Sequence, residues 1–280
     1  MKNYTIHIIL LCVLLFSCED ENLNDIASNQ FVVEGFIYAG EPIDDIRIKS
    51  TFPLTDEEDT SVPINDAEVS LTKDGERYTL LPSGQDGFYN YPGSDVSITT
   101  GDIIRLEVIH DGIMATAQTI VPTPTIGLNI SQDTIVVPKL PLSQGAEAIR
   151  MAVAKFVQES SIQITWDNPS EDFYFMVVEA VKDTLDPIFI DQVLSALERF
   201  RFVSEPTDVA SINFLAGTVQ SFGTYSVKIY HINEEYSALY ENSNQDSRDL
   251  NEPPSNVQNA LGVFSAFNSQ ELFFEVVRDN

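Results

Sequence analysis

The protein has 280 residues and a formal net charge of −28 at neutral pH, from 43 acidic and 15 basic side chains. A field this negative repels phosphate backbones, so the composition excludes nucleic acid as a partner. Hydrophobic residues make up 43% of the chain, which is enough for one or two packed domains and argues against intrinsic disorder.

Residues 1–17 have the pattern of a lipoprotein signal peptide. Lys2 is the only charge before Glu19, and the apolar run is too short to span a membrane. The run ends in "LFSC", which resembles the lipobox of bacterial lipoproteins, with Cys18 as the residue that receives the lipid. The pattern predicts a protein anchored to the outer membrane through acyl chains such as palmitate. The alternative is an ordinary signal peptide that happens to contain a cysteine.

An acidic run follows the predicted lipid attachment site. Glu19, Asp20 and Glu21 resemble the export signal that carries Bacteroidetes lipoproteins to the cell exterior. The alternative is a solvated tether without a receptor, and residues 18–29 are polar enough to form one. Cys12 leaves with the signal peptide and Cys18 is acylated, so disulfides and thiolate metal sites are excluded from the folded part.

Alternating apolar residues predict an N-terminal β-sandwich over residues 30–124. The stretches "FVVEGFIYAG" and "IRIKS" have strand period. Asp74-Gly75 and Asp111-Gly112 each separate two alternating runs, which favours β-hairpins with type I′ turns, and Asp86-Gly87 repeats the signal. The stretch "VPTPT" closes this domain because proline is incompatible with a central strand.

Residues 125–280 are expected to form a second β-sandwich with helical insertions. The stretch 130–155 is hard to place and could hold a strand plus an excursion. "SIQITWD" and residues 173–181 read as strands joined by a turn that starts at Asn168-Pro169, with Trp166 in the core. They resemble strands of a fibronectin type III-like sandwich. Residues 191–203 have the spacing of an amphipathic helix.

The remaining elements of this domain are predicted from the spacing of apolar residues and from a residue suited to cap a helix. "GTYSVKIYHI" reads as a strand, and "NEEYSALYEN" reads as a helix with Asn233 at its N-cap. The stretches "VQNALGVFSAF" and "QELFFEVV" are expected to pair as two strands about "NSQ". The overall expectation is a mainly β protein with one or two short helices.

The order of several stretches resembles a known family. The lipobox, "FVVEGFI", "INDAEVSLTKDGERYTL", "YSVKIYHINEEYSALYEN" and "SNVQNALGVFSAF" together look like the Bacteroidetes surface lipoproteins of the domain-of-unknown-function 4249 family. That resemblance implies a transthyretin-like or carboxypeptidase-regulatory-like domain followed by a fibronectin-like one. It also implies an accessory role beside a TonB-dependent outer-membrane β-barrel transporter, and it transfers neither a catalytic residue nor a cofactor.

The sequence offers little catalytic chemistry. His110 and His231 are the only histidines after the signal peptide, too few for a multi-histidine zinc site without carboxylates. No nucleophile elbow, zinc-protease helix or phosphate-binding loop occurs. We therefore expect a protein that is not an enzyme and carries no metal or cofactor. A hydrolase that uses an unrecognised pair of carboxylates stays open as an alternative to the accessory role.

Two further binding sites are conceivable from local composition. Asp56, Glu57, Glu58 and Asp59 form an acidic loop that could bind Ca²⁺, although it lacks the spacing of an EF-hand and would otherwise be a solvated loop. The aromatic residues of "GFYNYPG", which are Phe88, Tyr89 and Tyr91, could belong to a glycan- or peptide-binding surface module. Hairpin packing is the competing explanation for these rings.

Overall fold

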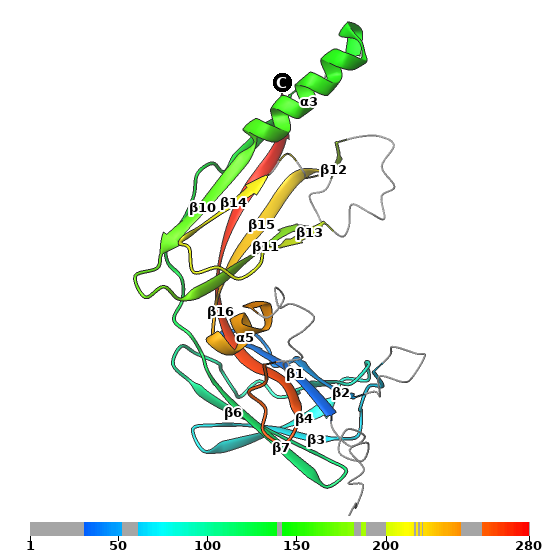
Figure 1. Ribbon diagram of the computed structural model, residues 1–280, viewed down its shortest axis with the longest axis vertical. Helices are drawn as coiled ribbons and strands as arrows, with labels where there is room; N and C mark the ends of the chain where they lie inside the picture. The colour runs from blue at the N-terminus through cyan, green and yellow to red at the C-terminus, as the bar shows by residue number, and fades with distance from the viewer. Residues whose placement is uncertain are drawn as a thin grey trace, which may run out of the picture.

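The computed structural model describes residues 31–51, 61–138, 142–181, 186–188, 200–215, 217, 219, 221–241 and 254–279. Within these ranges the protein is mainly β, as the sequence predicts, with two α-helices of 14 and 8 residues. The molecule is elongated and consists of two units stacked along its long axis (Figure 1). Each unit has its own buried apolar cluster.

The N-terminal unit follows the predicted hairpins closely. Its strands are β1 (Phe31–Tyr38), β2 (Asp45–Ser50), β3 (Glu68–Lys73), β4 (Glu76–Pro82), β5 (Phe88–Asn90), β6 (Ile103–His110) and β7 (Ile113–Ile120). The turns β3–β4 and β6–β7 have positive φ at both central residues, Asp74-Gly75 and Asp111-Gly112. These are the angles of a type I′ turn, so both hairpin predictions are confirmed.

The C-terminal unit holds the remaining elements apart from the last strand, which belongs to both units. They are β8 (Ile126–Ile130), β9 (Thr134–Val137), a 3-10 helix (Leu142–Gln144), α3 (Ala146–Glu159), β10 (Ser161–Asp167), β11 (Phe173–Ala180), β12 (Asp186–Pro187), β13 (Arg201–Val203), β14 (Ser211–Leu215), β15 (Ser221–Ile232) and α5 (Glu234–Glu241). Trp166 is buried in the core, as expected.

Helix α3 fills most of the stretch that the sequence left unplaced. Its sequence "AEAIRMAVAKFVQE" is rich in alanine, the residue with the highest helix propensity. None of its residues is buried, and the helix projects from one end of the molecule (Figure 1). The predicted helix over residues 191–203 lies outside the described residues up to 199, and its end, Arg201–Val203, is strand β13 instead.

The predicted strand pair about "NSQ" is wrong. Residues Leu261–Arg278 form one strand, β16, of 18 residues. Its first part pairs in parallel with β1, from Val32↔Leu261 to Tyr38↔Phe267. Its second part pairs antiparallel with β15. The polar residues after Phe267 therefore do not turn the chain; they lie where the strand passes from one unit to the other.

β16 makes a single mixed sheet out of strands from both units. The order is β13-β11-β15-β16-β1-β2-β5-β4-β3-β6-β7, with β12 beside β15 and β9 beside β16, while β14-β10-β8 form a separate small sheet among the described strands. Phe264 and Ala266 lie in the N-terminal core, and Phe274 and Val276 lie in the C-terminal core. The proposed domain boundary after residue 124 stays a prediction, and β16 contributes to both sides of it.

Candidate functional site

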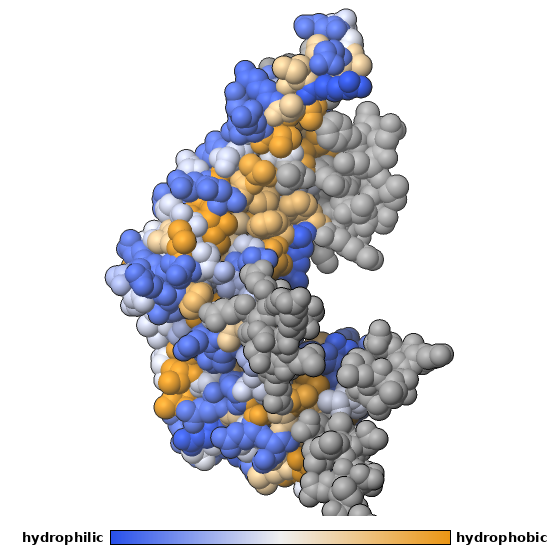
Figure 2. All heavy atoms as spheres, in the orientation of Figure 1, coloured by the Kyte–Doolittle hydropathy of each residue, from blue (hydrophilic) through white to orange (hydrophobic). Residues whose placement is uncertain are grey.

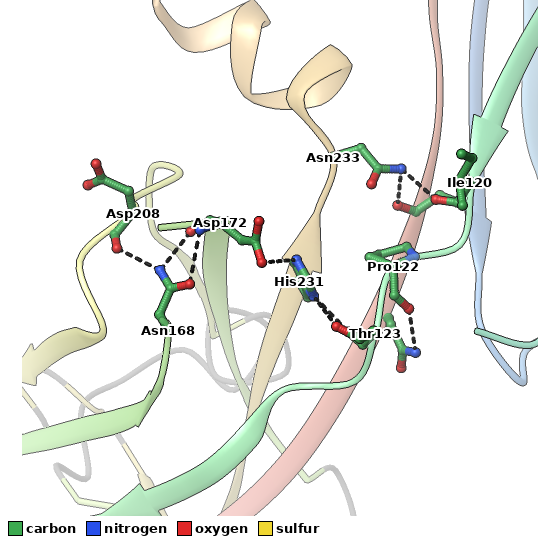
Figure 3. A network of polar contacts seen from close by, with 10 residues as sticks. Ile120, Pro122, Thr123, Asn168, Asp172, Asp208, His231 and Asn233 are labelled. Carbon is green, nitrogen blue, oxygen red and sulfur yellow. Dashed lines mark hydrogen bonds and ion pairs between the residues drawn. The ribbon is translucent and has the colours of Figure 1, made fainter. Parts of the chain in front are cut away.

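The junction of the two units is held by side chains that bind the backbone at the end of β7 and in the linker, which is the segment 121–125 between β7 and β8. Asn268 donates through Nδ2 to the carbonyl oxygen of Pro122, at 2.9 Å. Asn233 donates through Nδ2 to the carbonyl oxygen of Ile120, at 2.8 Å. His231 is the third member of this group, which we call the linker clamp (Figure 3). The bond to Pro122 is buried, and a buried backbone carbonyl needs such a partner, so the clamp fixes the path of the linker there.

His231 is buried and has both ring nitrogens engaged. Nδ1 lies 2.7 Å from the carbonyl oxygen of Thr123, which can only accept, so Nδ1 donates this hydrogen bond. Nε2 lies 3.5 Å from a carboxylate oxygen of Asp172. The ring also stacks on Tyr174, with centroids 4.6 Å apart. Because Nδ1 is committed to a carbonyl, it is not available as a base toward the nearby Thr123 hydroxyl, and the histidine is a structural clamp.

A side-chain turn places Asp172 opposite His231. Asn168 accepts the backbone N–H of Asp172 through Oδ1, at 2.9 Å. Its Nδ2 donates to the carbonyl oxygens of Asp172, at 2.9 Å, and Asp208, at 2.7 Å. The sequence predicts a turn beginning at Asn168-Pro169, and the structure has one. Figure 3 shows how this turn brings the carboxylate to the histidine ring.

Asn233 does more than begin helix α5. Its backbone carbonyl accepts the N–H groups of Tyr236 and Ser237, as expected for a residue at the N-cap position. Its side-chain Nδ2 donates to the Ile120 carbonyl oxygen and the Thr119 hydroxyl at the end of β7, and also to the Glu235 carboxylate in α5, at 3.3 Å. The same Thr119 hydroxyl donates to the Glu235 carboxylate, at 2.6 Å. The first turn of α5 is thereby tied to the end of β7.

The other face of the junction is aromatic. We call it the aromatic face, and its rings come from β1, β11, β15, β16 and α5: Phe36, Tyr38, Phe175, Tyr230, Tyr236 and Phe267. Phe267 lies at its centre, with ring centroids 5.2 Å from Tyr38 and 4.9 Å from Tyr236. Phe175 and Phe267 are buried, while the other four rings are half-buried. Neighbouring rings at these distances contribute beyond their buried area.

Burial changes the acid–base behaviour of the aromatic face. It raises the pKa of Tyr230 to about 12 and also raises the pKa of Tyr38 and Tyr236. Burial raises the pKa of the Asp45 carboxyl too, although the Tyr38 hydroxyl donates to it, at 3.0 Å. A low-dielectric environment favours the neutral forms of all four groups.

The predicted site residues fall into two groups, those outside the described residues and those used in packing. Cys18, Glu19, Asp20 and Glu21 lie outside the described residues, as does the acidic loop Asp56–Asp59. The aromatic residues of "GFYNYPG" are mostly used in packing. Tyr89 is fully buried, with its hydroxyl donating to the carbonyl oxygen of Ile64. Phe88 is half-buried with Arg47 over its ring, and the Tyr91 hydroxyl donates to Asp95.

The distinctive stretch "SNVQNALGVFSAF" has a structural role. Asn256 binds the backbone of Phe264 through both ends of its amide, and Gln258 bridges to the backbone of Thr116 in β7. Gly262 follows, with φ of 117° and no room for a side chain: an added Cβ would lie 1.9 Å from the carbonyl oxygen of Val33. The stretch thus closes the N-terminal unit between β7 and β1.

Two absences apply to the described part of the chain. It contains no group of three or more His, Cys, Asp and Glu side chains arranged to hold a metal ion. None of its helices has the length and apolar character needed to cross a bilayer.

Comparison with known proteins identifies the family. Similar solved structures include a two-domain fibronectin type III segment of chicken tenascin (10% identity, TM-score 0.25), which covers 88% of this chain and 97% of that one. Fibronectin domains of chicken CNTN1 (11% identity, TM-score 0.24) cover 87% of this chain and 66% of that one. A titin segment, domains A168–A170 (10% identity, TM-score 0.21), covers 73% and 60%. No curated protein matches the sequence. The profile described as "Domain of unknown function (DUF4249)" matches residues 19–272, which is most of the chain, and the protein belongs to this family.

Proposed function

We propose that this protein is an outer-membrane lipoprotein, anchored through Cys18 and displayed at the cell exterior through Glu19, Asp20 and Glu21. It acts as an accessory interaction subunit of a TonB-dependent transporter and is not itself an enzyme. The N-terminal unit would be transthyretin-like or carboxypeptidase-regulatory-like and the C-terminal unit fibronectin-like. The signal sequence and the family membership support this proposal.

The observation that carries the proposal is the way the units are joined. β16 runs through both units without a break, and the linker clamp fixes the second connection. Two independent links between units resist bending better than a single flexible linker. A pair of units joined at two points suits a protein that is held at a membrane by one end and presents the other end to a large partner.

The first test is affinity purification of the tagged, lipidated protein from outer membranes solubilised in mild detergent, followed by mass spectrometry. A β-barrel transporter recovered in near-equal amount is the expected result. The Cys18→Ala variant is the control, because loss of the anchor should remove the barrel from the eluate while leaving the soluble chain intact. Recovery of the protein alone in both samples would contradict the accessory role.

The export signal has its own test. Replacing Glu19, Asp20 and Glu21 with alanine should protect the protein from protease added to whole cells, because the variant would stay on the inner face of the outer membrane. Lipidation itself should be unchanged, and this is checked by acyl labelling at Cys18. Equal protease sensitivity of the variant and the natural chain would show that these three acidic residues do not direct the protein to the cell exterior.

The aromatic face favours a second candidate, a glycan- or peptide-binding surface module. Half-buried tyrosines beside a carboxylate, as at Tyr38 and Asp45, are suited to binding a ligand that has both apolar and hydroxyl groups. A thermal-shift screen of glycans tests this idea, because a ligand at 100 times its dissociation constant stabilises a protein by about 2.7 kcal/mol. No shift with any glycan would remove the support for this candidate.

A further inference from the structure

Strand β9 has an edge that pairs with no other described strand. It pairs in parallel with the end of β16 alone. The N–H of Glu275 donates to the carbonyl oxygen of Asp133, and the N–H of Asp279 donates to that of Val137. In a parallel pair of strands, every second residue directs both its N–H and its C=O to the partner strand, and the residues between them direct theirs to the other side. Residues 133, 135 and 137 therefore face β16, while Thr134 and Val136 turn their backbone groups to the open edge.

The second half of helix α3, from Ala152 onward, lies near this open edge without covering it. A groove of about 440 Å³ separates the two elements, with Thr134, Val136 and Pro138 on one wall and Ala152, Lys155 and Phe156 on the other. Proteins commonly protect an edge by packing a helix against it, but here no residue of α3 is buried. Figure 2 shows apolar side chains gathered at the foot of the helix.

The dimensions of the groove match an extended peptide. The four residues of β9 span about 13 Å, and the helical wall from Ala152 to Ser160 spans about 12 Å. Both lengths correspond to about four residues of a strand. The outward N–H and C=O groups of Thr134 and Val136 offer two donors and two acceptors to such a strand.

The chemistry of the walls selects the peptide. Val136 is 50% exposed, and Pro138, Ala152 and Phe156 add further apolar surface. The rim carries Lys155 and Glu159, whose charged groups lie 3.9 Å apart and balance each other. The rest of the chain is strongly acidic, with a net charge of −28, so it attracts basic segments and repels acidic ones.

We propose that the groove between β9 and α3 binds an extended peptide segment of a partner protein, which adds to β9 as an extra strand. The segment alternates apolar residues with neutral or basic ones. This mode of recognition uses backbone hydrogen bonds for affinity and side-chain pockets for selection. The inference goes beyond the transporter proposal and stands whether or not a transporter is the partner.

The test uses the full mature chain in detergent and a defined probe. The probe is a fluorescent hexapeptide with capped ends, Lys-Val-Thr-Val-Lys-Val, and its binding is followed by fluorescence anisotropy. A second probe has the same sequence with N-methyl groups on alternate amides, which removes the donors that a strand needs. We expect saturable binding of the first probe and at least tenfold weaker binding of the second.

Matched variants locate the binding. Ala152→Trp fills the groove from the helix, whereas Ala154→Trp adds the same side chain to an exposed position outside it. Val136→Pro removes an outward N–H without removing a hydrogen bond to β16, and Val136→Thr keeps that N–H. Ala152→Trp and Val136→Pro should weaken binding at least tenfold, and their controls less than twofold. Circular dichroism checks that each variant folds.

Three outcomes would overturn the proposal. The unmodified probe could fail to bind, which would mean that Pro138 and the short strand block the edge. The N-methylated probe could bind equally well, which would indicate nonspecific apolar contact. Binding could also be the same in Ala152→Trp and Ala154→Trp, which would place the peptide elsewhere. None of these results depends on recovery of a transporter, so the two proposals fail separately.

Discussion

The same two strands build both faces of the junction, and they do so in different ways. His231 and Asn268 are cross-strand partners of β15 and β16 and point to the linker. The residues immediately before them, Tyr230 and Phe267, point to the opposite side and belong to the aromatic face. Side chains alternate across a strand, so a shift of one residue would exchange polar and aromatic groups between the faces.

The two faces contribute different properties to the junction. Burial of aromatic surface provides most of the free energy and tolerates small changes in angle. Hydrogen bonds to named carbonyls contribute less net free energy, but they are satisfied only at one position of the linker. We therefore expect the aromatic face to determine how strongly the units hold together and the linker clamp to determine their relative orientation.

The largest expected effect is at Gly262, which pairs with Val33 of β1 in the first part of β16. Gly262→Ala places a Cβ against the backbone of Val33 and should destabilise the protein by about 4 kcal/mol or more, through overlap and backbone strain. Chemical denaturation measures the change. Gly112→Ala is the control, because Gly112 also has positive φ but open space around it, and it should cost only about 1 kcal/mol. Equal effects would mean that the close contact at Val33 does not matter.

Phe267→Ala removes the centre of the aromatic face. The expected loss is about 3 to 4 kcal/mol in the free energy of unfolding, since a large buried ring is replaced by a cavity. Phe267→Leu should recover a large part of that loss because it refills the volume. A loss below about 1 kcal/mol in urea denaturation would show that the aromatic face is not the main source of stability.

Asn268→Ala removes one member of the linker clamp. The carbonyl of Pro122 loses its buried donor, and the expected cost is about 2 kcal/mol, less than that of the neighbouring Phe267→Ala. Small-angle X-ray scattering should show a wider spread of shapes, because the linker can then shift. Gln270→Ala, an exposed position on the same strand, should change neither measurement. An unchanged scattering curve for Asn268→Ala would show that the linker clamp does not determine the relative orientation of the two units.

The buried tyrosines have no effect on the pH dependence of stability near neutrality, and their effect appears only at alkaline pH. Tyrosines in the unfolded chain ionise near pH 10, whereas burial raises the pKa of Tyr230 to about 12 and also raises that of Tyr38. The stabilising contribution is thus complete below about pH 10 and declines as the pH rises toward 12, because the unfolded state releases protons first. The melting temperature should fall over this range, and the fall should be smaller in Tyr230→Phe. If all tyrosines of the folded protein showed phenolate absorbance near pH 10, the raised pKa of Tyr230 and Tyr38 would be contradicted.

Local signals in the sequence predicted the local structure well. The Asp74-Gly75 and Asp111-Gly112 turns need positive φ, and glycine beside aspartate provides it wherever the chain folds back. Strand period likewise predicted β1, β10, β11 and β15. These features depend on residues that are close in sequence, so one segment contains all the information.

The errors arise where distant residues decide the structure. Asn268 looks like part of a turn, but it binds Pro122, which lies 146 residues away, and the strand continues through the junction. The linker clamp and the aromatic face could not be predicted for the same reason. Helix α3 is different, because its alanine-rich sequence favours a helix. The proline and glycine residues just before it favour a loop, and for that reason the stretch could not be assigned from its sequence.

The length of β16 has a consequence for how the chain matures. β1 pairs with residues that lie more than two hundred positions later in the chain, from Val32↔Leu261 onward. The N-terminal unit thus cannot complete its sheet until the region around Leu261 has been synthesised, and such distant pairing slows folding. During that delay the edge of β1 is exposed to wrong partners. A chain that crosses a membrane unfolded would gain from this dependence, because it delays folding until almost the whole chain has passed.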